Sequence, residues 1–271
     1  MSEAAVKRES VGPWPTLAAV REQAPVVQNI TNFVAMDLAA NVLLAVGASP
    51  AMVRDAEEIP DFAVLADAVT INIGTLSSQA VEAMARAARE AVAQGKPWVL
   101  DPVGAGTTAL RRETAQRLVR LKPTVIRGNG AEILALGDAG SGQCRGLDSD
   151  IDSVAALDAA RDLAGATGAV VAVTGTVDYV TDGQAVVAVA NGDALMTRVT
   201  AIGCALSCLI GACCAVNPAP LTAAVHALAI MGVAAENAAA AATGPGSFRV
   251  GLLDALYNLD AHGLDSNARI D

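Results

Sequence analysis

Short runs of β-branched and other apolar residues alternate with alanine-rich amphipathic runs through the first two thirds of the chain. The apolar runs predict strands at residues 25–30, 51–54, 69–73, 98–101, 124–127 and 169–174. The amphipathic runs predict helices at residues 34–46, 78–94, 111–121, 132–136 and 154–163. Strands that alternate with helices indicate parallel βαβ units in a layered α/β sheet.

The pattern changes after residue 174. Two valine-containing stretches within residues 178–189 flank Asp182 and Gly183, which predicts a β-hairpin. Three helical segments follow without a strand between them, at residues 204–216, 221–242 and 248–259. No linker or internal repeat interrupts the chain. We therefore expect a single domain over residues 1–271, with residues 1–20 and 261–271 as peripheral or poorly ordered tails.

Composition supports a large core and argues against nucleic acid as a partner. Of the 271 residues 53% are apolar, only 17% are charged and 3% are aromatic, so alanine, valine and leucine must fill the core. The net charge is −10, and Arg111 with Arg112 forms the one cluster of basic residues. A protein that neutralises nucleic-acid phosphates needs a basic face.

The cysteines indicate a reducing compartment. They number five, an odd count, and four of them lie within residues 204–214. No spacing typical of structural zinc is present. Residues 1–10 are charged and lack an apolar signal region, so we expect a cytoplasmic protein. The uncharged stretch 199–216 has no aromatic belt and is followed by Pro218 and Pro220, so we expect a buried core helix and no membrane span.

The first candidate for chemistry is the small-residue segment 201–205. Ala201 and Gly203 precede or begin an apolar helix, whose free amides and positive dipole end suit an anion such as a phosphoryl group. Cys204 lies in the first turn, where a thiol pKa falls and a thiolate could accept a proton. The alternative is a close-packed helix start with a buried, inert cysteine.

The other candidates follow predicted strands. Asp101 ends a predicted strand and precedes a glycine-containing turn, where it could face a metal or phosphate in a crevice; the alternative is an ordinary polar turn after a buried strand. Asn129 and Glu132 have the spacing of a helix capping box, while Glu132 could also orient a metal-bound water and Arg127 could pair with phosphate. Thr174 is either a phosphate contact or an ordinary turn residue.

In order along the chain, eight short blocks closely resemble the hydroxyethylthiazole kinase family, and the similarity runs from residue 26 to residue 259. They are QNITN (28–32), GASPAM (47–52), INIGTL (71–76), LDPVG (100–104), IRGN (126–129), VTG (173–175), GCALS (203–207) and GPGSF (244–248).

The resemblance implies a ribokinase-like fold, with three α/β/α layers around a central, mostly parallel sheet. It also implies transfer of the γ-phosphoryl group of ATP, with Mg²⁺, to the hydroxyl of 4-methyl-5-(2-hydroxyethyl)thiazole. The thiazole phosphate that forms is used in thiamine phosphate biosynthesis or salvage. The resemblance further implies a homotrimer with substrate sites at the subunit interfaces.

The resemblance also implies roles for individual residues. Substrate contacts fall on Met52, Asn29, Ala201 and Gly203; ATP contacts on Arg127 and Thr174; and the metal site on Asp101 and Glu132. The catalytic candidates are Cys204, which at most helps to remove the alcohol proton, and Glu132.

Two features qualify this resemblance. Ala201 stands where the family usually has glycine, which matters if the backbone there needs a positive φ. Cys204 is shared with the thiazole kinases, whereas wider relatives of the fold place an aspartate there. Two rival functions remain, a same-fold NAD(P)H-hydrate dehydratase that uses ADP or ATP and a non-catalytic thiazole-binding module. Thiazole-dependent ADP production separates the kinase from both.

Overall fold

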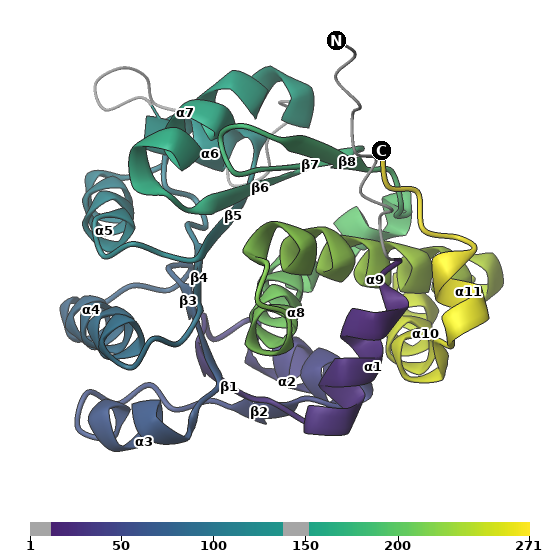
Figure 1. The fold of residues 1–271 in the computed structure, drawn as a ribbon, viewed down its shortest axis with the longest axis horizontal. Coiled ribbons are helices and arrows are strands. Elements are labelled where there is room, and N and C mark those ends of the chain that lie inside the picture. Colours follow the sequence, from purple (N-terminus) through teal and green to yellow (C-terminus); the bar gives the residue numbers. More distant parts are fainter. Residues whose placement is uncertain (1–11, 138–151) are drawn as a thin grey trace, which may run out of the picture.

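A central eight-stranded sheet lies between two layers of helices in the computed structural model, which describes residues 12–137 and 152–271 (Figure 1). The strand order is β2-β1-β3-β4-β5-β6-β7-β8. The strands are β1 (Val26–Ile30), β2 (Ser49–Ala51), β3 (Ala68–Asn72), β4 (Trp98–Asp101), β5 (Val125–Asn129), β6 (Val170–Thr174), β7 (Asp178–Thr181) and β8 (Val186–Val189). Neighbours from β2 to β6 pair in parallel, and β7 and β8 are antiparallel. The expected ribokinase-like, mostly parallel α/β/α architecture is confirmed.

The helices cover the two faces of the sheet separately (Figure 1). One layer contains α3 (Ile59–Leu65), α4 (Ser78–Ala93), α5 (Ala109–Val119), α6 (Gly130–Gly137) and α7 (Leu157–Thr167). The other contains α1 (Trp14–Gln23), α2 (Met36–Ala45), α8 (Ile202–Val216), α9 (Pro220–Ala241), α10 (Pro245–Asn258) and α11 (Ala261–Asp265). The connections also include the short helices η1 (Ser153–Ala156) and η2 (Ala194–Arg198).

Each face of the sheet has its own hydrophobic core. Val99 and Val125 point into the core beneath α8 and α9, whereas their neighbours Leu100 and Ile126 point into the core beneath α4 and α5. Successive residues of a strand face opposite sides, so a strand covered on both faces must be apolar throughout. This is why the parallel strands were recognisable as continuous apolar runs.

The apolar helices behind the sheet are buried. The stretch 199–216 contains α8, most of which is buried. Within the described residues one helix, Pro220–Ala241, is long and apolar enough to cross a membrane by length and composition, and 78% of its most apolar window is buried inside the protein. Packing within the fold therefore accounts for the apolar character of both helices.

The element boundaries differ from the prediction mainly at the second strand and in three short helices. The strand expected at residues 51–54 is β2 at Ser49–Ala51, an edge strand that tolerates Pro50 because its missing N–H costs no ladder bond. Helices α1, α3 and α11 were not predicted. The first two carry a proline in the first turn, where proline is compatible with a helix. The hairpin is present, with Gly183 at φ +93° in its turn.

Residues 12–20 and 261–271, part of the segments expected as peripheral or poorly ordered tails, pack against the rest of the fold. Helix α1 buries Leu17 and Val20, Leu264 of α11 is buried, and Ile270 forms a bridge with Val189 at the edge of the sheet. Residues 1–11 lie outside the described residues, as does Cys144. Sequence alone could not place these ends because their packing partners lie far away along the chain.

Candidate active site

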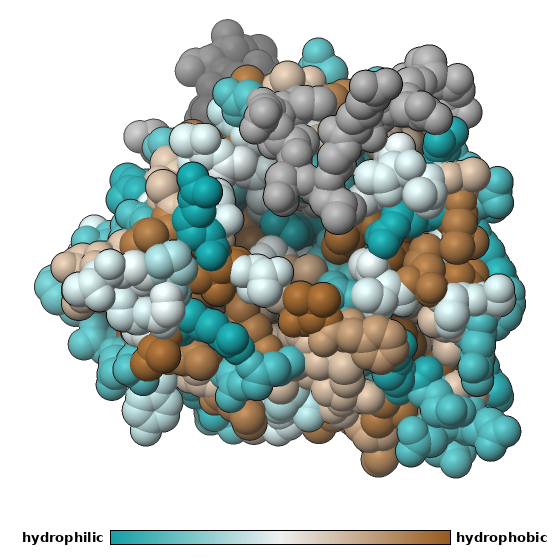
Figure 2. Space-filling model, turned by 180° about the vertical axis from the view of Figure 1, so that it is seen from behind, coloured by the Kyte–Doolittle hydropathy of each residue, from teal (hydrophilic) through white to brown (hydrophobic). Residues whose placement is uncertain are grey.

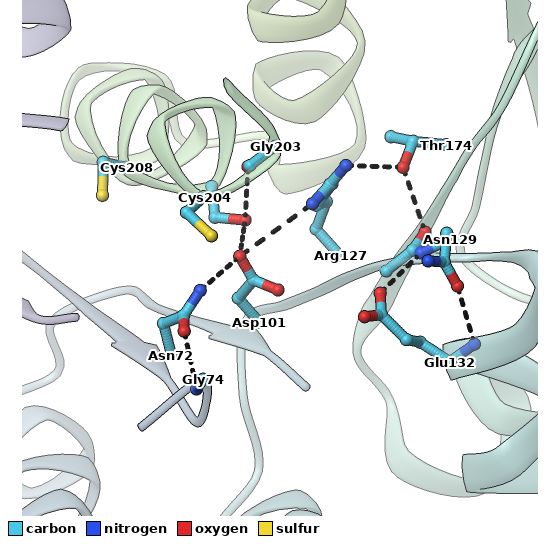
Figure 3. Close-up of polar contacts among 12 residues, drawn as sticks. Asn72, Gly74, Asp101, Arg127, Asn129, Glu132, Thr174, Gly203, Cys204 and Cys208 are labelled. Atoms are coloured by element: carbon cyan, nitrogen blue, oxygen red, sulfur yellow. Dashed lines mark hydrogen bonds and ion pairs between the residues drawn. The ribbon is translucent and has the colours of Figure 1, made fainter. Parts of the chain in front are cut away.

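Polar side chains from four neighbouring strands meet where those strands end, opposite the start of α8 (Figure 3). Asn72 ends β3, Asp101 ends β4, Arg127 lies within β5 and Thr174 ends β6. Because parallel strands present their carboxyl ends at one edge of the sheet, residues distant in sequence converge there. Cys204 approaches the same point from the first turn of α8 (Figure 3).

The carboxylate of Asp101 is held by one oxygen only. Its Oδ2 accepts hydrogen bonds from Asn72 Nδ2 at 2.8 Å and Ser207 Oγ at 2.9 Å, and lies 3.9 Å from Arg127 Nη1. Its Oδ1 is buried without a hydrogen-bond partner in the described part of the chain. Burial raises the pKa of Asp101, while Arg127 and the two hydrogen bonds lower it. The free oxygen suits a cation.

The guanidinium of Arg127 has donors to spare. Nη2 donates to Thr174 Oγ1 at 2.6 Å, whereas Nε is buried and unpartnered among the described residues. A Cβ on Gly203 would lie 2.7 Å from Nη1, so only glycine lets the start of α8 approach the guanidinium so closely. A partly buried guanidinium beside a helix N-terminus is a site for an anion.

Glu132 forms the capping box that the spacing predicted. Its backbone N–H donates to Asn129 Oδ1 at 2.9 Å, and its Oε2 accepts from the Asn129 N–H at 2.9 Å. Its Oε1 accepts from the Gly104 N–H at 2.9 Å, and burial, with the charge of Asp101, raises the pKa of Glu132 to about 7. A carboxylate accepts up to about four hydrogen bonds, so the capping box leaves room for a further ligand.

The thiol of Cys204 differs from the sequence prediction. Asn32 Nδ2 lies 3.3 Å from Sγ, within hydrogen-bond reach. Burial, reinforced by the charge of Asp101, raises the pKa of Cys204 to about 11. The expectation of a lowered pKa at the helix N-terminus is therefore wrong, because the loss of solvent disfavours the charged thiolate. The thiol is protonated at neutral pH.

Ala201 adopts the left-handed conformation. The sequence alone left open whether the backbone here needs a positive φ. Its φ is +71° and its ψ is 2° at the N-cap of α8. An L-residue with a Cβ pays about 1 kcal/mol for this conformation. The backbone turn into α8 is thus retained despite the methyl group.

Of the remaining substrate candidates, Met52 and Asn29 have different surroundings. Met52 directly follows β2 and is partly buried against the core that contains α8. Asn29 is buried, and its amide is bonded at both ends inside the fold: Nδ2 donates to Val27 O at 2.7 Å and Oδ1 accepts from Thr70 Oγ1 at 2.6 Å. A contact between Asn29 and the substrate stays a prediction.

The asparagine that reaches the site is Asn32, which sequence reasoning passed over. Besides contacting Cys204, its Nδ2 donates to Asn72 Oδ1 at 2.9 Å, and its Oδ1 accepts from the N–H groups of Val34 and Ala35. Asn72 and Ser207, which hold Asp101, were also missed. Position just beyond a strand's carboxyl end was the available signal for Asn32.

Magnesium fits the chemistry of the available donors. No group of three or more His, Cys, Asp or Glu residues that could enclose a metal occurs at positions 12–137 or 152–271. Mg²⁺ needs no such group, because it is commonly held by one or two carboxylates together with substrate phosphates. The free Oδ1 of Asp101 and the buried carboxylate of Glu132 supply oxygen ligands of that kind.

Comparison with known proteins gives one consistent result. The model of the hydroxyethylthiazole kinase family matches residues 17–262. A hydroxyethylthiazole kinase of Cereibacter sphaeroides is 56% identical over 255 residues, which cover 94% of this chain and 97% of that protein. The structure of a hydroxyethylthiazole kinase protein from Pyrococcus horikoshii superposes with a TM-score of 0.89 at 42% identity, over 96% of this chain and 98% of that one.

A more distant structure shows only the shared fold. Pyridoxal kinase from Staphylococcus aureus, in complex with AMP-PCP, matches with a TM-score of 0.55 at 17% identity, over 77% of this chain and 88% of that one.

Proposed function

The chain belongs to the hydroxyethylthiazole kinase family, and we propose that it carries out its phosphoryl transfer at the edge formed by Asp101, Arg127, Thr174 and Cys204. The reaction moves the γ-phosphoryl group of ATP to the hydroxyl of 4-methyl-5-(2-hydroxyethyl)thiazole and yields a thiazole phosphate for thiamine synthesis. The observation that carries the site assignment is the partly buried Arg127, with spare donors, next to an Asp101 with a free oxygen.

Arg127 and Thr174 bind the phosphates of ATP. The guanidinium already contacts the Thr174 hydroxyl, so both can point at one phosphate group. The first amides of α8, at Gly203 and Cys204, provide the positive end of a helix dipole for the phosphoryl group in transfer. Phosphoryl transfer depends mainly on alignment and on neutralising charge, and these groups supply both.

Asp101 and Glu132 would hold Mg²⁺ through carboxylate oxygens. The ion would neutralise charge on the phosphates. The protein's contribution is orientation: Asn72 and Ser207 fix one oxygen of Asp101, and Gly104 with Asn129 fix Glu132.

Cys204 lines the alcohol's position as a neutral thiol. A thiol with a pKa of about 11 is a weak base in its resting state, so its help in removing the alcohol proton comes late in the transfer. Met52 borders the thiazole on the side of β2. Asn32, which contacts the thiol, joins Asn29 among the substrate-side residues.

We also propose a cytoplasmic homotrimer with the site at the subunit interface. Phe33 and Val34, directly beside Asn32, are 65% and 61% exposed, and apolar residues reach the surface at several places on the face shown in Figure 2. Large exposed apolar side chains next to a site favour burial by a second subunit. Light scattering that finds a stable, fully active monomer would overturn this proposal.

An ATP-consumption assay over a panel of alcohols tests the function directly. The panel contains hydroxyethylthiazole, a hydroxymethylpyrimidine and a sugar. We expect ADP release with the thiazole only, coupled to appearance of the thiazole phosphate. The rival functions predict other outcomes: a dehydratase acts on hydrated NADH without phosphorylating the thiazole, and a binding module gives calorimetric heat without ADP.

A further inference from the structure

Arg111, in the first turn of α5, donates hydrogen bonds to the loops that follow two neighbouring strands. Its Nη1 donates to the carbonyl of Ile73 at 2.9 Å and to that of Val103 at 2.7 Å, and its Nη2 donates to the carbonyl of Gly74 at 2.7 Å. Ile73 and Gly74 follow β3, and Val103 lies two residues beyond β4. One planar guanidinium therefore binds both of the turns that follow β3 and β4, the strands that end in Asn72 and Asp101.

The Ile73–Gly74 peptide links Arg111 to Asp101 through a chain of hydrogen bonds. The chain has no cis peptide bond among the described residues, and a planar trans peptide directs its C=O and N–H to opposite sides. With Ile73 O held by Arg111, the Gly74 N–H is directed at Asn72 Oδ1, 2.9 Å away. Asn72 Nδ2 in turn donates to Asp101 Oδ2, and Figure 3 shows Asn72 between Gly74 and Asp101.

The Val103–Gly104 peptide does the same for Glu132. Arg111 holds Val103 O, and the N–H of the same peptide, at Gly104, donates to Glu132 Oε1 at 2.9 Å. Gly104 has φ +66°, so the turn needs glycine to present this N–H. The carbonyls bound to a cation polarise their peptides, which strengthens the N–H as a donor on the other side.

We propose that Arg111 is a positioning residue that sets the directions of the Asp101 and Glu132 carboxylates through these two peptides. The inference rests on the proposed function, in which those carboxylates organise Mg²⁺ and phosphate. It requires the fork of the guanidinium: a lysine ammonium keeps the charge but offers its donors from a single atom, and cannot reproduce three carbonyl bonds made from two nitrogens.

Arg112 provides a matched control. It is the next residue of α5, is likewise only partly buried, and has the same charge. Its side chain makes no hydrogen bond or ion pair with another residue of the described ranges, whereas that of Arg111 makes three hydrogen bonds.

The test compares Arg111→Lys, Arg111→Ala and Arg112→Ala in the full chain. Steady-state kinetics give kcat and the KM for thiazole, calorimetry gives the affinity for ADP with and without Mg²⁺, and thermal denaturation monitors folding. For Arg111→Lys we expect kcat to fall about 30-fold, as for a site displaced by a fraction of an ångström. We expect the thiazole KM and the metal-free ADP affinity to stay within about twofold, and most of the Mg²⁺-dependent gain in ADP affinity to disappear.

The inference is overturned if Arg111→Lys keeps both kcat and the Mg²⁺-dependent gain at the level of Arg112→Ala. It is also overturned if Arg111→Lys lowers the affinities for metal-free ADP and for thiazole as much as it lowers the Mg²⁺-dependent gain, because such a uniform loss indicates a general folding defect. Arg111→Ala should show the same pattern more strongly; if it does not fold, the lysine variant still decides.

Glu132→Gln, measured in parallel, separates this inference from the proposed function. If the parent protein releases no thiazole-dependent ADP, the proposed function fails. If Glu132→Gln keeps full activity, that carboxylate has no role in transfer, and the inferred path from Arg111 through Gly104 to Glu132 fails while the kinase activity stands. If Glu132→Gln is slow and Arg111→Lys is not, only the role of Arg111 fails.

Discussion

The turn region beside α5 (residues 73–74 and 103–104) and the site region beside α8 (Asp101, Arg127 and Cys204) both contact a partly buried arginine, but the donors of the two arginines are used differently. In the turn region Arg111 makes three hydrogen bonds to backbone carbonyls. In the site region Arg127 makes one hydrogen bond to Thr174, faces Asp101 at 3.9 Å, and leaves a buried Nε without a partner in residues 12–137 and 152–271. The first arginine is occupied by the fold, and the second is available to a ligand.

Two asparagines three residues apart differ in where their hydrogen bonds go. Asn29 uses both ends of its amide inside the strands, while Asn32 directs its amide nitrogen at Asn72 and at the thiol of Cys204. Leaving a buried polar group unpaired costs about 1–3 kcal/mol, so such groups are retained mainly where a ligand completes them. The buried Nε of Arg127 and Oδ1 of Asp101, which are unpaired among the described residues, therefore indicate ligand contacts, whereas the amides of Asn29 and Asn32 are both bonded within the fold.

The largest expected effect is at Arg127. Arg127→Ala should lower kcat/KM for ATP by about 10³-fold, because an arginine that neutralises a transferring phosphoryl group is worth that much. Arg127→Lys, which keeps a charge beside Asp101, should remain folded and still lose about 10²-fold. The matched control is Arg117→Ala, since Arg117 pairs with Glu82 at the surface. Near-normal ATP kinetics in both Arg127 variants would contradict the comparison.

Glu132 is bonded within the fold and is also a proposed metal ligand, so a variant at this position tests which of the two roles matters. If its charge organises metal and phosphate, Glu132→Gln should lower kcat by about 10²-fold or more in a folded protein. If the capping box is its whole role, activity should hold and the free energy of unfolding should fall by about 1 kcal/mol. Kinetics and urea denaturation on the same variant decide between these results.

Cys204→Ser should slow turnover by about tenfold, since alignment and the helix amides persist without the thiol. Because burial raises the pKa of Cys204 to about 11, the thiolate fraction and the alkylation rate should rise about tenfold per pH unit from pH 7 to 10. Bound thiazole should protect Cys204 from alkylation. Mass spectrometry of iodoacetamide-treated protein measures the rate, and rapid alkylation of Cys204 at pH 7 would show that the pKa is not raised.

The smallest expected effect is at Ala201. Ala201→Gly removes about 1 kcal/mol of left-handed strain, part of which the greater freedom of unfolded glycine offsets. We expect a gain of about 0.5 kcal/mol in the free energy of unfolding, with activity within twofold of the parent. Ala205→Gly, inside α8, should instead lower that free energy by about 1 kcal/mol. Equal behaviour of the two variants in urea denaturation would argue against strain at Ala201.

The sequence by itself determined what local contacts and periodicity control. Apolar strands between amphipathic helices specified a parallel layered sheet, and Asp182 with Gly183 specified the hairpin. Asn129 and Glu132, three residues apart, specified a capping box whose hydrogen bonds are present. Each depends on neighbours within a few residues, so propensity and spacing are sufficient.

The tertiary structure alone decided how the polar residues divide into those that hold the site and those that act in it. Ser207 meets Asp101 across 106 residues, and Arg111 meets Ile73 across 38. The same packing buries the thiol of Cys204, so its pKa rises where the helix position by itself predicted a fall. Desolvation and long-range hydrogen bonds arise only when the sheet brings distant strand ends together, and no local sequence pattern records them.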